Sequence, residues 1–398
     1  MEFASRTNVR HPKVHIYETL EDMLYNTDSD SDIPELPAPP IKVEDIKGCQ
    51  DLLIFIDYIK AYKAYRKNKT FKYLIKVEDP LRELNRMVGM CEIKRTIADQ
   101  VLYYSKMLAK GRGKLEGEVI TKLNTAIYGD PGCGKTTIAH LIGKIYRKLG
   151  IVKNDKFIIG RRDNMIGKYL GQTAPKTRDT IKSASGGILF LDEVYQFGSA
   201  GSGNKDSYAK EVADTVNQYI TENPGDVVFI VAGYRDQVKA CWFAQNAGLE
   251  RRFKWSYSIK AYGEKELLQI FYTQAKRLGY EIKADTLALP TTSQSVVPEE
   301  TTIKKNKRRR SIVIPLSAGE KFFKEHKQHF KYGGGDTETF LEKCIIINEK
   351  RTIVETWDEH KITDIDIQKG LVEYLKYTED RKPPSDEIDK EMRDRLYN

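Results

Sequence analysis

The sequence predicts an α/β fold, in which a mainly parallel β-sheet is flanked by helices, followed by a smaller helical domain. A glycine-rich loop, GDPGCGKT at residues 129 to 136, lies between a short apolar run and a helical pattern. Four apolar residues at 188 to 191 directly precede two acids. Other short apolar runs alternate with helical stretches up to about residue 262, after which no strong strand pattern returns. Alternating strands and helices are typical of a parallel sheet with right-handed crossovers.

The glycine-rich loop predicts a nucleotide triphosphate site. It fits the pattern G-x-x-x-x-G-K-[ST], whose glycines let successive backbone amides face a phosphate chain. The surrounding order is the required one, because residues 123 to 128 read as a buried strand and an apolar helical stripe follows, with Gly150 as its stop. That stripe consists of Ile138, Leu141, Ile142, Ile145 and Leu149. A glycine turn before an ordinary helix is the alternative, and this order argues against it.

Each residue type in the loop has a use in phosphate chemistry. The helix N-terminus directs its free amides at the phosphates, Lys135 adds a positive charge for the β and γ phosphates, and the Thr136 hydroxyl is placed to ligate Mg²⁺. We therefore expect ATP and Mg²⁺ as ligands, and a catalytic contribution from Lys135. The expected nucleotide-binding residues are Gly129, Asp130, Pro131, Gly132, Cys133, Gly134, Lys135, Thr136 and Thr137.

The two acids after the apolar run predict the hydrolytic part of the site. Asp192 and Glu193 follow a strand buried on both faces, and ligands bind at the carboxyl edge of such sheets. Asp192 is expected to hold Mg²⁺ directly or through water, and Glu193 to act as the general base for the attacking water. Two acids after a strand could also cap a helix. Their occurrence with Lys135 in one domain favours the catalytic interpretation.

Composition sets wider bounds. The chain has 398 residues, of which 40% are hydrophobic and 31% charged, enough for two or three compact units. It has no apolar run near 18 residues and no cleavable N-terminal signal, so we expect neither a membrane span nor secretion. The five cysteines are scattered without metal-ligand spacing. We therefore expect an intracellular protein, cytoplasmic or nuclear, with reduced thiols.

The chain is expected to contain five segments. They are an acidic, Pro-rich disordered tail (1–44), an N-terminal helical segment (45–79), the nucleotide-binding α/β domain (80–262), a helical domain (263–377) and a C-terminal tail (378–398). The expected strands lie at 124–128, 157–159, 187–191, 227–232 and 255–259. The last helix is predicted to begin at the cap Thr363, with an apolar stripe of Ile365, Ile367, Leu371, Val372 and Leu375.

Much of the net charge of +9 lies in one segment of the helical domain. The run KKNKRRR at 304 to 310 lies within a Ser, Thr and Pro-rich stretch at about 285 to 315, which predicts a disordered insertion. The run could be a nuclear address, a nucleic-acid contact or a charged surface loop.

Six blocks of sequence together resemble one family, the AAA+ ATPases of the CbbX and SpoVK type. The blocks are residues 80–90, the phosphate loop, 165–181, 186–197, 227–238 and 246–253. The resemblance spans roughly residues 80 to 275 and implies a P-loop AAA+ parallel sheet with a smaller C-terminal helical lid. The lid matches weakly. The tails and the Lys, Asn and Ile-rich composition resemble members from large DNA viruses.

The resemblance implies a catalytic arginine supplied by a neighbouring subunit. The block NAGLERRF at 246 to 253 is similar to the segment that carries the family's arginine finger, with Arg252 as the better match and Arg251 as the alternative. The finger would touch the γ phosphate bound by the next subunit, so hydrolysis should require a ring. Two surface arginines at a helix end remain the other interpretation.

The resemblance also implies a pore loop. Tyr169 and Leu170, between Gly167 and Gly171, are similar to the aromatic pore-loop residues of ring translocases. Such side chains would grip an extended polypeptide in a central channel. The alternative is a tyrosine packed beneath the sheet.

Two positions depart from the family pattern. Tyr234 stands at the sensor-1 position, where many relatives have Asn; it is kept as a catalytic candidate. In the lid, YGGGDTETFLEKC at 332 to 344 has no Arg at the sensor-2 place, and Arg351 could supply that function instead.

Cys133 lies inside the phosphate loop beside Lys135. Helix N-termini and nearby cations favour thiolate, so we expect a reactive thiol whose modification blocks ATP binding. The alternative is a small residue tolerated at a variable position.

The function predicted from the sequence is an ATP-hydrolysing ring, most simply a homo-hexamer, that remodels a protein substrate through a central pore. A nucleic-acid motor or loader, acting through residues 304–310, is one alternative, and a nucleotide-gated scaffold with little turnover is another.

Overall fold

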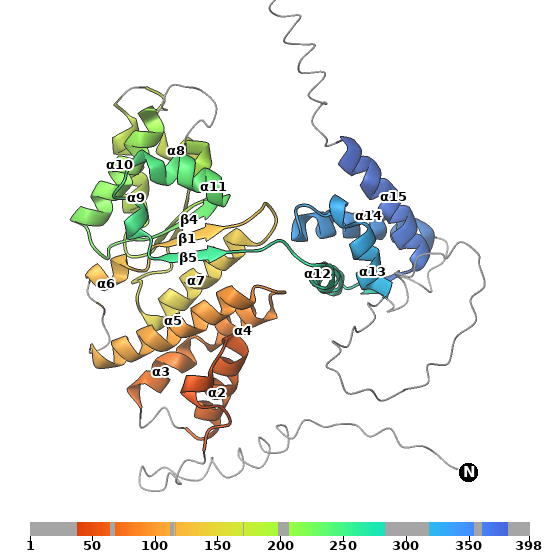
Figure 1. Ribbon diagram of the computed structural model, residues 1–398, viewed down its shortest axis with the longest axis horizontal. Coiled ribbons are helices and arrows are strands. Elements are labelled where there is room, and N and C mark those ends of the chain that lie inside the picture. The colour runs from red at the N-terminus through yellow and green to blue at the C-terminus, as the bar shows by residue number, and fades with distance from the viewer. Residues whose placement is uncertain are drawn as a thin grey trace, which may run out of the picture. The chain divides into compact units, whose positions relative to one another are not determined.

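The computed structural model describes residues 38–63, 68–111, 115, 117–169, 171–197, 207–282, 318–353 and 360–380 (Figure 1). Contacts divide the chain into two compact units: unit 1 holds residues 1–127 and 136–258, and unit 2 holds residues 128–135 and 259–398. The basic insertion predicted at 285–315 lies outside the described residues. So do most of the predicted N-terminal tail and residues 381–398.

A five-stranded sheet has the order β2-β3-β4-β1-β5. Its strands are β1 (Thr125–Tyr128), β2 (Phe157–Gly160), β3 (Ile188–Leu191), β4 (Val228–Gly233) and β5 (Trp255–Ser258). β2 pairs with β3 and β3 with β4 in parallel. The amides of Trp255 and Ile259 donate to the carbonyls of Asn124 and Tyr128, so β5 runs parallel to β1 as well. The predicted parallel sheet flanked by helices is confirmed.

Helices supply the layers around this sheet (Figure 1). In unit 1 they are α5 (Cys91–Lys110), α6 (Gly117–Thr121), α7 (Lys135–Leu149, which begins in unit 2), α8 (Arg162–Met165), α9 (Thr173–Ser183), α10 (Ser207–Glu222) and α11 (Arg235–Gln237). The predicted apolar stripe of α7 is buried throughout. It packs against α5, where Ile97, Val101 and Tyr104 face Ile142 and Tyr146. This packing anchors the helix that follows the phosphate loop.

Shorter elements complete unit 1. They are η1 (Val43–Asp45), η3 (Val194–Phe197), η4 (Val238–Trp242), η5 (Phe243–Gln245) and η6 (Glu250–Arg252). The predicted N-terminal helix is divided into α2 (Cys49–Ala61) and α3 (Lys69–Lys76), with α4 (Glu78–Arg86) next, and Figure 1 shows all three grouped with α5. The apolar face of α2 is buried, including Leu52, Ile56 and Ile59. This segment therefore adds buried side chains to the hydrophobic core, as expected of a packing helix.

Unit 2 has its own aromatic core. Its helices are α12 (Glu264–Arg277), α13 (Ala318–Glu325), η7 (Lys327–His329), α14 (Gly334–Thr352) and α15 (Asp364–Asp380). Phe271, Phe323, Phe340 and Tyr374 pack together in the centre. A two-stranded parallel sheet, β6 (Glu281–Ile282) with β7 (Lys361–Ile362), was not predicted, because two-residue strands carry no periodic pattern.

The apolar stripe predicted for α15 is partly wrong. Ile367 is buried, but Ile365 and Val372 are 54% and 53% exposed. Tyr374 takes the central core position, because its hydroxyl donates to the His329 carbonyl while its ring packs on Phe330. Within the described parts of the chain, every helix is too short or too polar to cross a bilayer.

Candidate nucleotide site and arginine loop

The phosphate loop has a backbone that only glycine adopts readily. Gly132 and Gly134 have φ of +68° and +97°, in the left-handed region that favours glycine. A Cβ on Gly132 would also lie 2.4 Å from the Tyr332 carbonyl oxygen of unit 2, the unit to which the loop belongs by its contacts. The Tyr262 hydroxyl donates to the Cys133 carbonyl at 2.9 Å. The loop is therefore held in a curled form by other residues of unit 2.

Lys135 lies across this curled loop. Its side chain is buried at 6% exposure, and its Nζ donates to the carbonyls of Gly129 and Asp130 at 3.1 Å each. A buried ammonium that contacts carbonyl oxygens is available to a stronger anionic acceptor such as a phosphate. This is the arrangement expected of a phosphate-binding lysine.

Thr136 and Asp192 are brought together in unit 1. The Thr136 Oγ1 lies 3.4 Å from Oδ2 of Asp192, which follows the fully buried strand β3. Oδ1 of Asp192 accepts from the Glu193 amide at 3.1 Å. A hydroxyl and a carboxylate oxygen are the hard ligands that Mg²⁺ prefers, and it binds few protein ligands beside substrate phosphates. The donor set therefore fits Mg²⁺.

Glu193 has an unusual backbone and a partner that the sequence did not suggest. Its φ is +49°, which is rare for a residue with a side chain and is concentrated at functional sites. The Tyr195 hydroxyl lies near the Glu193 carboxylate, and burial together with this negative neighbour raises the pKa of Tyr195. Tyr195 therefore stays neutral and can donate its hydroxyl hydrogen to the glutamate.

Tyr234 lies beside the same pair. It directly follows β4, and its ring centroid is 5.5 Å from that of Tyr195, tilted by 45°. The sensor-1 candidate thus contacts the residue that holds Glu193. Its catalytic role stays a prediction.

The two arginine candidates differ in their surroundings. Arg251 is exposed, whereas Arg252 is half-buried and its Nε donates to Oδ1 of Asn217 at 2.5 Å. Both line a cavity of about 440 Å³ together with Lys122, Lys254 and Glu118. Thr136, Asp192 and Glu193 do not line this cavity.

The pore-loop candidates are described in part. Tyr169 is 70% exposed, so the alternative of a tyrosine packed beneath the sheet is wrong. Leu170 lies outside the described residues. Gly171 has φ +80°, and a Cβ on Gly167 would lie 2.5 Å from Cβ of Gln172. Glycine at both positions thus permits a tight loop ahead of α9.

The structure contradicts the expected thiolate at Cys133. The side chain is 4% exposed, and burial raises the pKa of its thiol more than the positive charge of Lys135 lowers it. The helix N-terminus and the lysine are present as the sequence indicated, but desolvation outweighs them.

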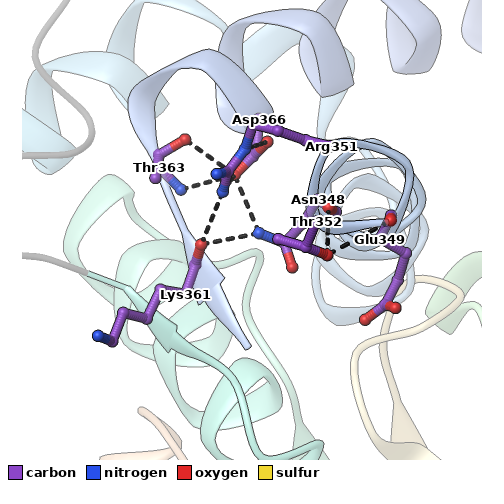
Figure 2. Close-up of polar contacts among 7 residues, drawn as sticks. All are labelled: Asn348, Glu349, Arg351, Thr352, Lys361, Thr363 and Asp366. Atoms are coloured by element: carbon purple, nitrogen blue, oxygen red, sulfur yellow. Dashed lines mark hydrogen bonds and ion pairs between the residues drawn. The ribbon is translucent and has the colours of Figure 1, made fainter. Parts of the chain in front are cut away.

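Arg351 does not fit a sensor-2 role. Figure 2 shows its guanidinium against Asp366, with Nε and Nη2 donating to the carboxylate at 3.1 and 3.0 Å. Asp366 is fully buried and also accepts from Asn348, at 3.2 Å, and from Thr363. An arginine that neutralises a buried carboxylate is costly to withdraw. The suggestion that it substitutes for a sensor arginine is therefore wrong.

These features define a protein that binds and hydrolyses a nucleoside triphosphate. The family model for the ATPase family associated with various cellular activities (AAA) matches residues 125–241. A CfxQ-like protein of Acanthamoeba polyphaga mimivirus is 31% identical over 80% of this chain and 69% of its own length. Stage V sporulation protein K of Bacillus subtilis is 32% identical over 58% of this chain and 69% of its own length.

A further relative matches a smaller part of the chain. CbbX of Cereibacter sphaeroides is 32% identical over 48% of this chain and 62% of its own length. A RuvB mutant of Thermotoga maritima aligns in structure at a TM-score of 0.42 with 15% identity, over 71% of this chain and 69% of that one, a likeness too low to support an argument. The chain belongs to the AAA+ ATPases of the CbbX and SpoVK type, with a relative in a large DNA virus, and it is an ATPase.

Proposed function

We propose that the protein forms a ring, most simply a homo-hexamer, that uses ATP to remodel another protein in a central pore. The observation that carries this proposal is the 70% exposure of Tyr169 in a loop bounded by glycines. In a ring, one such tyrosine from each subunit would line a common channel. Aromatic rings there can hold an extended polypeptide by stacking and by steric contact.

Hydrolysis is assigned to residues of the phosphate loop and to residues that follow strands β3 and β4. The loop amides and Lys135 bind the β and γ phosphates. Thr136 and Asp192 would hold Mg²⁺, which when bound neutralises charge on the phosphates. Glu193, oriented by Tyr195, accepts the proton of the attacking water. Tyr234 supports this pair.

Arg252 is assigned to the site of the neighbouring subunit. Its support is the separate, cation-rich cavity that it lines together with Arg251, Lys122 and Lys254. A finger of this kind contributes about 10³ to 10⁵ in rate, or roughly 4 to 7 kcal/mol of transition-state stabilisation. Isolated subunits should therefore bind ATP but hydrolyse it slowly.

A substrate trap tests the function. Glu193→Gln removes the base and leaves the phosphate contacts, so the variant should hold ATP, stay assembled and retain its substrate. Proteins that co-purify with this variant in ATP, and not with wild type, identify the substrate. Hydrolysis at the wild-type rate would contradict the role of Glu193.

The pore loop is tested separately with a matched control. Tyr169→Ala should keep ATPase activity within about twofold and lose remodelling of the trapped substrate, because the ring no longer grips. Tyr103→Ala removes a tyrosine of similar exposure, 57%, from α5 and should leave both activities unchanged. Equal remodelling by both variants would refute the pore role.

The same preparation discriminates the alternatives. Nucleic acid in the trap, with binding that weakens steeply as salt rises, would replace the protein substrate by DNA or RNA. Assembly without turnover would indicate a nucleotide-gated scaffold.

A further inference from the structure

A chain of polar side chains joins helix α10 to the loop that carries Arg252. Asn246 Nδ2 donates to Oδ1 of Asp214 at 2.7 Å, and Asn217 Nδ2 donates to Oδ1 of Asn246 at 3.4 Å. Asn217 Oδ1 in turn accepts from Arg252 Nε at 2.5 Å. Asp214 and Asn217 lie three residues apart on α10, hence on one face of the helix. The arginine is therefore tied to a packed helix.

The two ends of this chain fix the orientation of both amides. A carboxylate accepts hydrogen bonds only, and a guanidinium only donates them. Asn246 must therefore turn its NH₂ toward Asp214, which leaves its oxygen for Asn217 and for the Gly248 amide at 2.8 Å. Asn217 must then turn its oxygen toward Arg252. The four hydrogen bonds are thus compatible with a single orientation of the two amides.

The hydrogen bond from Arg252 to Asn217 uses Nε and leaves the two terminal nitrogens of the guanidinium for a phosphate. Nε is bonded to Asn217, so the two terminal NH₂ groups can form the fork that binds phosphate oxygens. Among the contacts of the described residues, exposed Arg251 has no comparable hydrogen bond. A side chain held before its ligand arrives loses less freedom when it binds. This difference favours Arg252 as the arginine set for catalysis.

We infer that Asn217 is a positioning residue for Arg252 and aims its guanidinium at the nucleotide of the neighbouring subunit. The inference rests on the proposed action of Arg252 in trans. Asn217 touches no reacting atom; it acts through the arginine. Asp214 and Asn246 keep its amide in the required orientation.

Kinetics of full-length variants give the first test. Asn217→Leu should lower kcat about 10²-fold, the loss typical of a misplaced catalytic group, with ATP affinity within about twofold of wild type. Gln218→Leu removes an amide from the adjacent, exposed position of α10 and should change neither value. Asn217→Ala, which adds no branched side chain, should repeat the loss. An unchanged kcat in both Asn217 variants would overturn the inference.

Mixed rings test whether the defect acts in trans. Glu193→Gln protomers have a defective site of their own and an intact Arg252. When they are mixed in equal amounts with Asn217→Leu protomers, about a quarter of head-to-tail interfaces combine an intact site with an intact finger. ATPase activity should therefore recover well above that of either variant alone. Asn217→Leu mixed with Arg252→Ala should stay inactive, because both lack a working finger.

The pattern of recovery distinguishes failure of the trans action of Arg252 from failure of the positioning role of Asn217. Arg252→Ala mixed with Glu193→Gln must recover, and its failure would overturn the trans finger and this inference with it. If that mixture recovers and Asn217→Leu recovers with Arg252→Ala instead, Asn217 serves its own subunit's site. If Asn217→Leu recovers with neither Glu193→Gln nor Arg252→Ala, the Asn217 substitution damages the fold. Either result overturns the positioning role.

Discussion

Asp366→Ala is expected to destabilise unit 2 strongly, because its carboxylate is the centre of the network in Figure 2. It accepts two hydrogen bonds from Arg351, two from Thr363 and one from Asn348 at 2.8 to 3.2 Å. Removing one partner of a buried ion pair costs about 3 to 5 kcal/mol. Since the Arg351 side chain is 19% exposed and can be partly hydrated, we expect about 3 kcal/mol, near the lower limit.

The assay is thermal unfolding combined with hydrogen exchange of α14 and α15. A loss of about 3 kcal/mol corresponds to roughly 6 to 12 °C in the melting temperature of a domain of this size. Exchange in peptides of α14 and α15 should accelerate more than exchange in the sheet of unit 1. Glu373→Ala removes an exposed carboxylate from the same helix, whose ion pair with Lys376 at 2.9 Å is itself exposed, and should melt like wild type.

Two results would refute this reasoning. One is an Asp366→Ala protein that melts within about 2 °C of wild type. The other is Arg351→Ala protein that is fully folded at the assay temperature yet loses ATPase activity, since that would restore a sensor role to this arginine. The double variant Arg351→Met with Asp366→Leu should recover much of the stability, because well-packed apolar residues can replace a buried ion pair.

The stabilisation by Asp366 should depend on pH. Burial alone would raise the pKa of Asp366, but the hydrogen bonds from Arg351, Thr363 and Asn348 outweigh it and lower that pKa below its usual value. A depressed carboxyl pKa contributes stability that is fully present above the unfolded value, about 3.9, and is lost as pH falls through the folded value. The difference in stability between wild type and Asp366→Asn should therefore be constant near neutrality and shrink below about pH 4.

Three further predictions follow from the nucleotide site. Gly132→Ala should abolish ATP binding in a titration, because its added Cβ would lie 2.4 Å from a backbone carbonyl. Gly150→Ala is the control, because Gly150 has a similar φ, +79°, with open space around it. Its loss of stability, about 1 to 2 kcal/mol, measures the backbone cost alone. N-ethylmaleimide should label exposed Cys91 well before buried Cys133 in mass spectra, and faster labelling of Cys133 would contradict its raised pKa. Tyr195→Phe should lower kcat about tenfold with unchanged ATP affinity, because the catalytic carboxylate loses an orienting donor; an unchanged kcat would exclude that role.

The parts of the fold that the sequence predicts are those with short-range signals. The strand, glycine loop and helix from residue 123 to 149 occupy consecutive positions, and an apolar run before Asp192 predicts a buried strand without further information. Parallel pairing follows because each strand is separated from the next by helical sequence. All five strands of the sheet lie within one or two residues of their predicted bounds.

The contacts that tune the site join distant positions, so no local pattern predicts them. Asn217 and Arg252 are 35 residues apart, and a single asparagine on a helix reads as an ordinary surface residue. Tyr195 lies two residues after Glu193, yet spacing alone does not show which way a tyrosine ring turns after a residue with positive φ. The reactivity of Cys133 was mistaken for a related reason: sequence shows neighbouring charges and does not show burial.

The segment at 332 to 344 has no arginine at the sensor-2 place, and it contacts the phosphate loop through its backbone. Within unit 2, the phosphate loop is contacted by the Tyr262 hydroxyl, which donates to the Cys133 carbonyl, and by the backbone of Tyr332 and Gly335, which approaches Gly132. A side chain larger than hydrogen does not fit at Gly132, so glycine there lets the backbone of Tyr332 and Gly335 approach the loop closely. This backbone contact stands where relatives use a charged side chain. Any adjustment of the loop on binding ATP has to be accommodated at these contacts. We therefore expect the lid to respond to phosphate through the loop itself, and Tyr262→Phe to weaken that response more than Arg351→Ala.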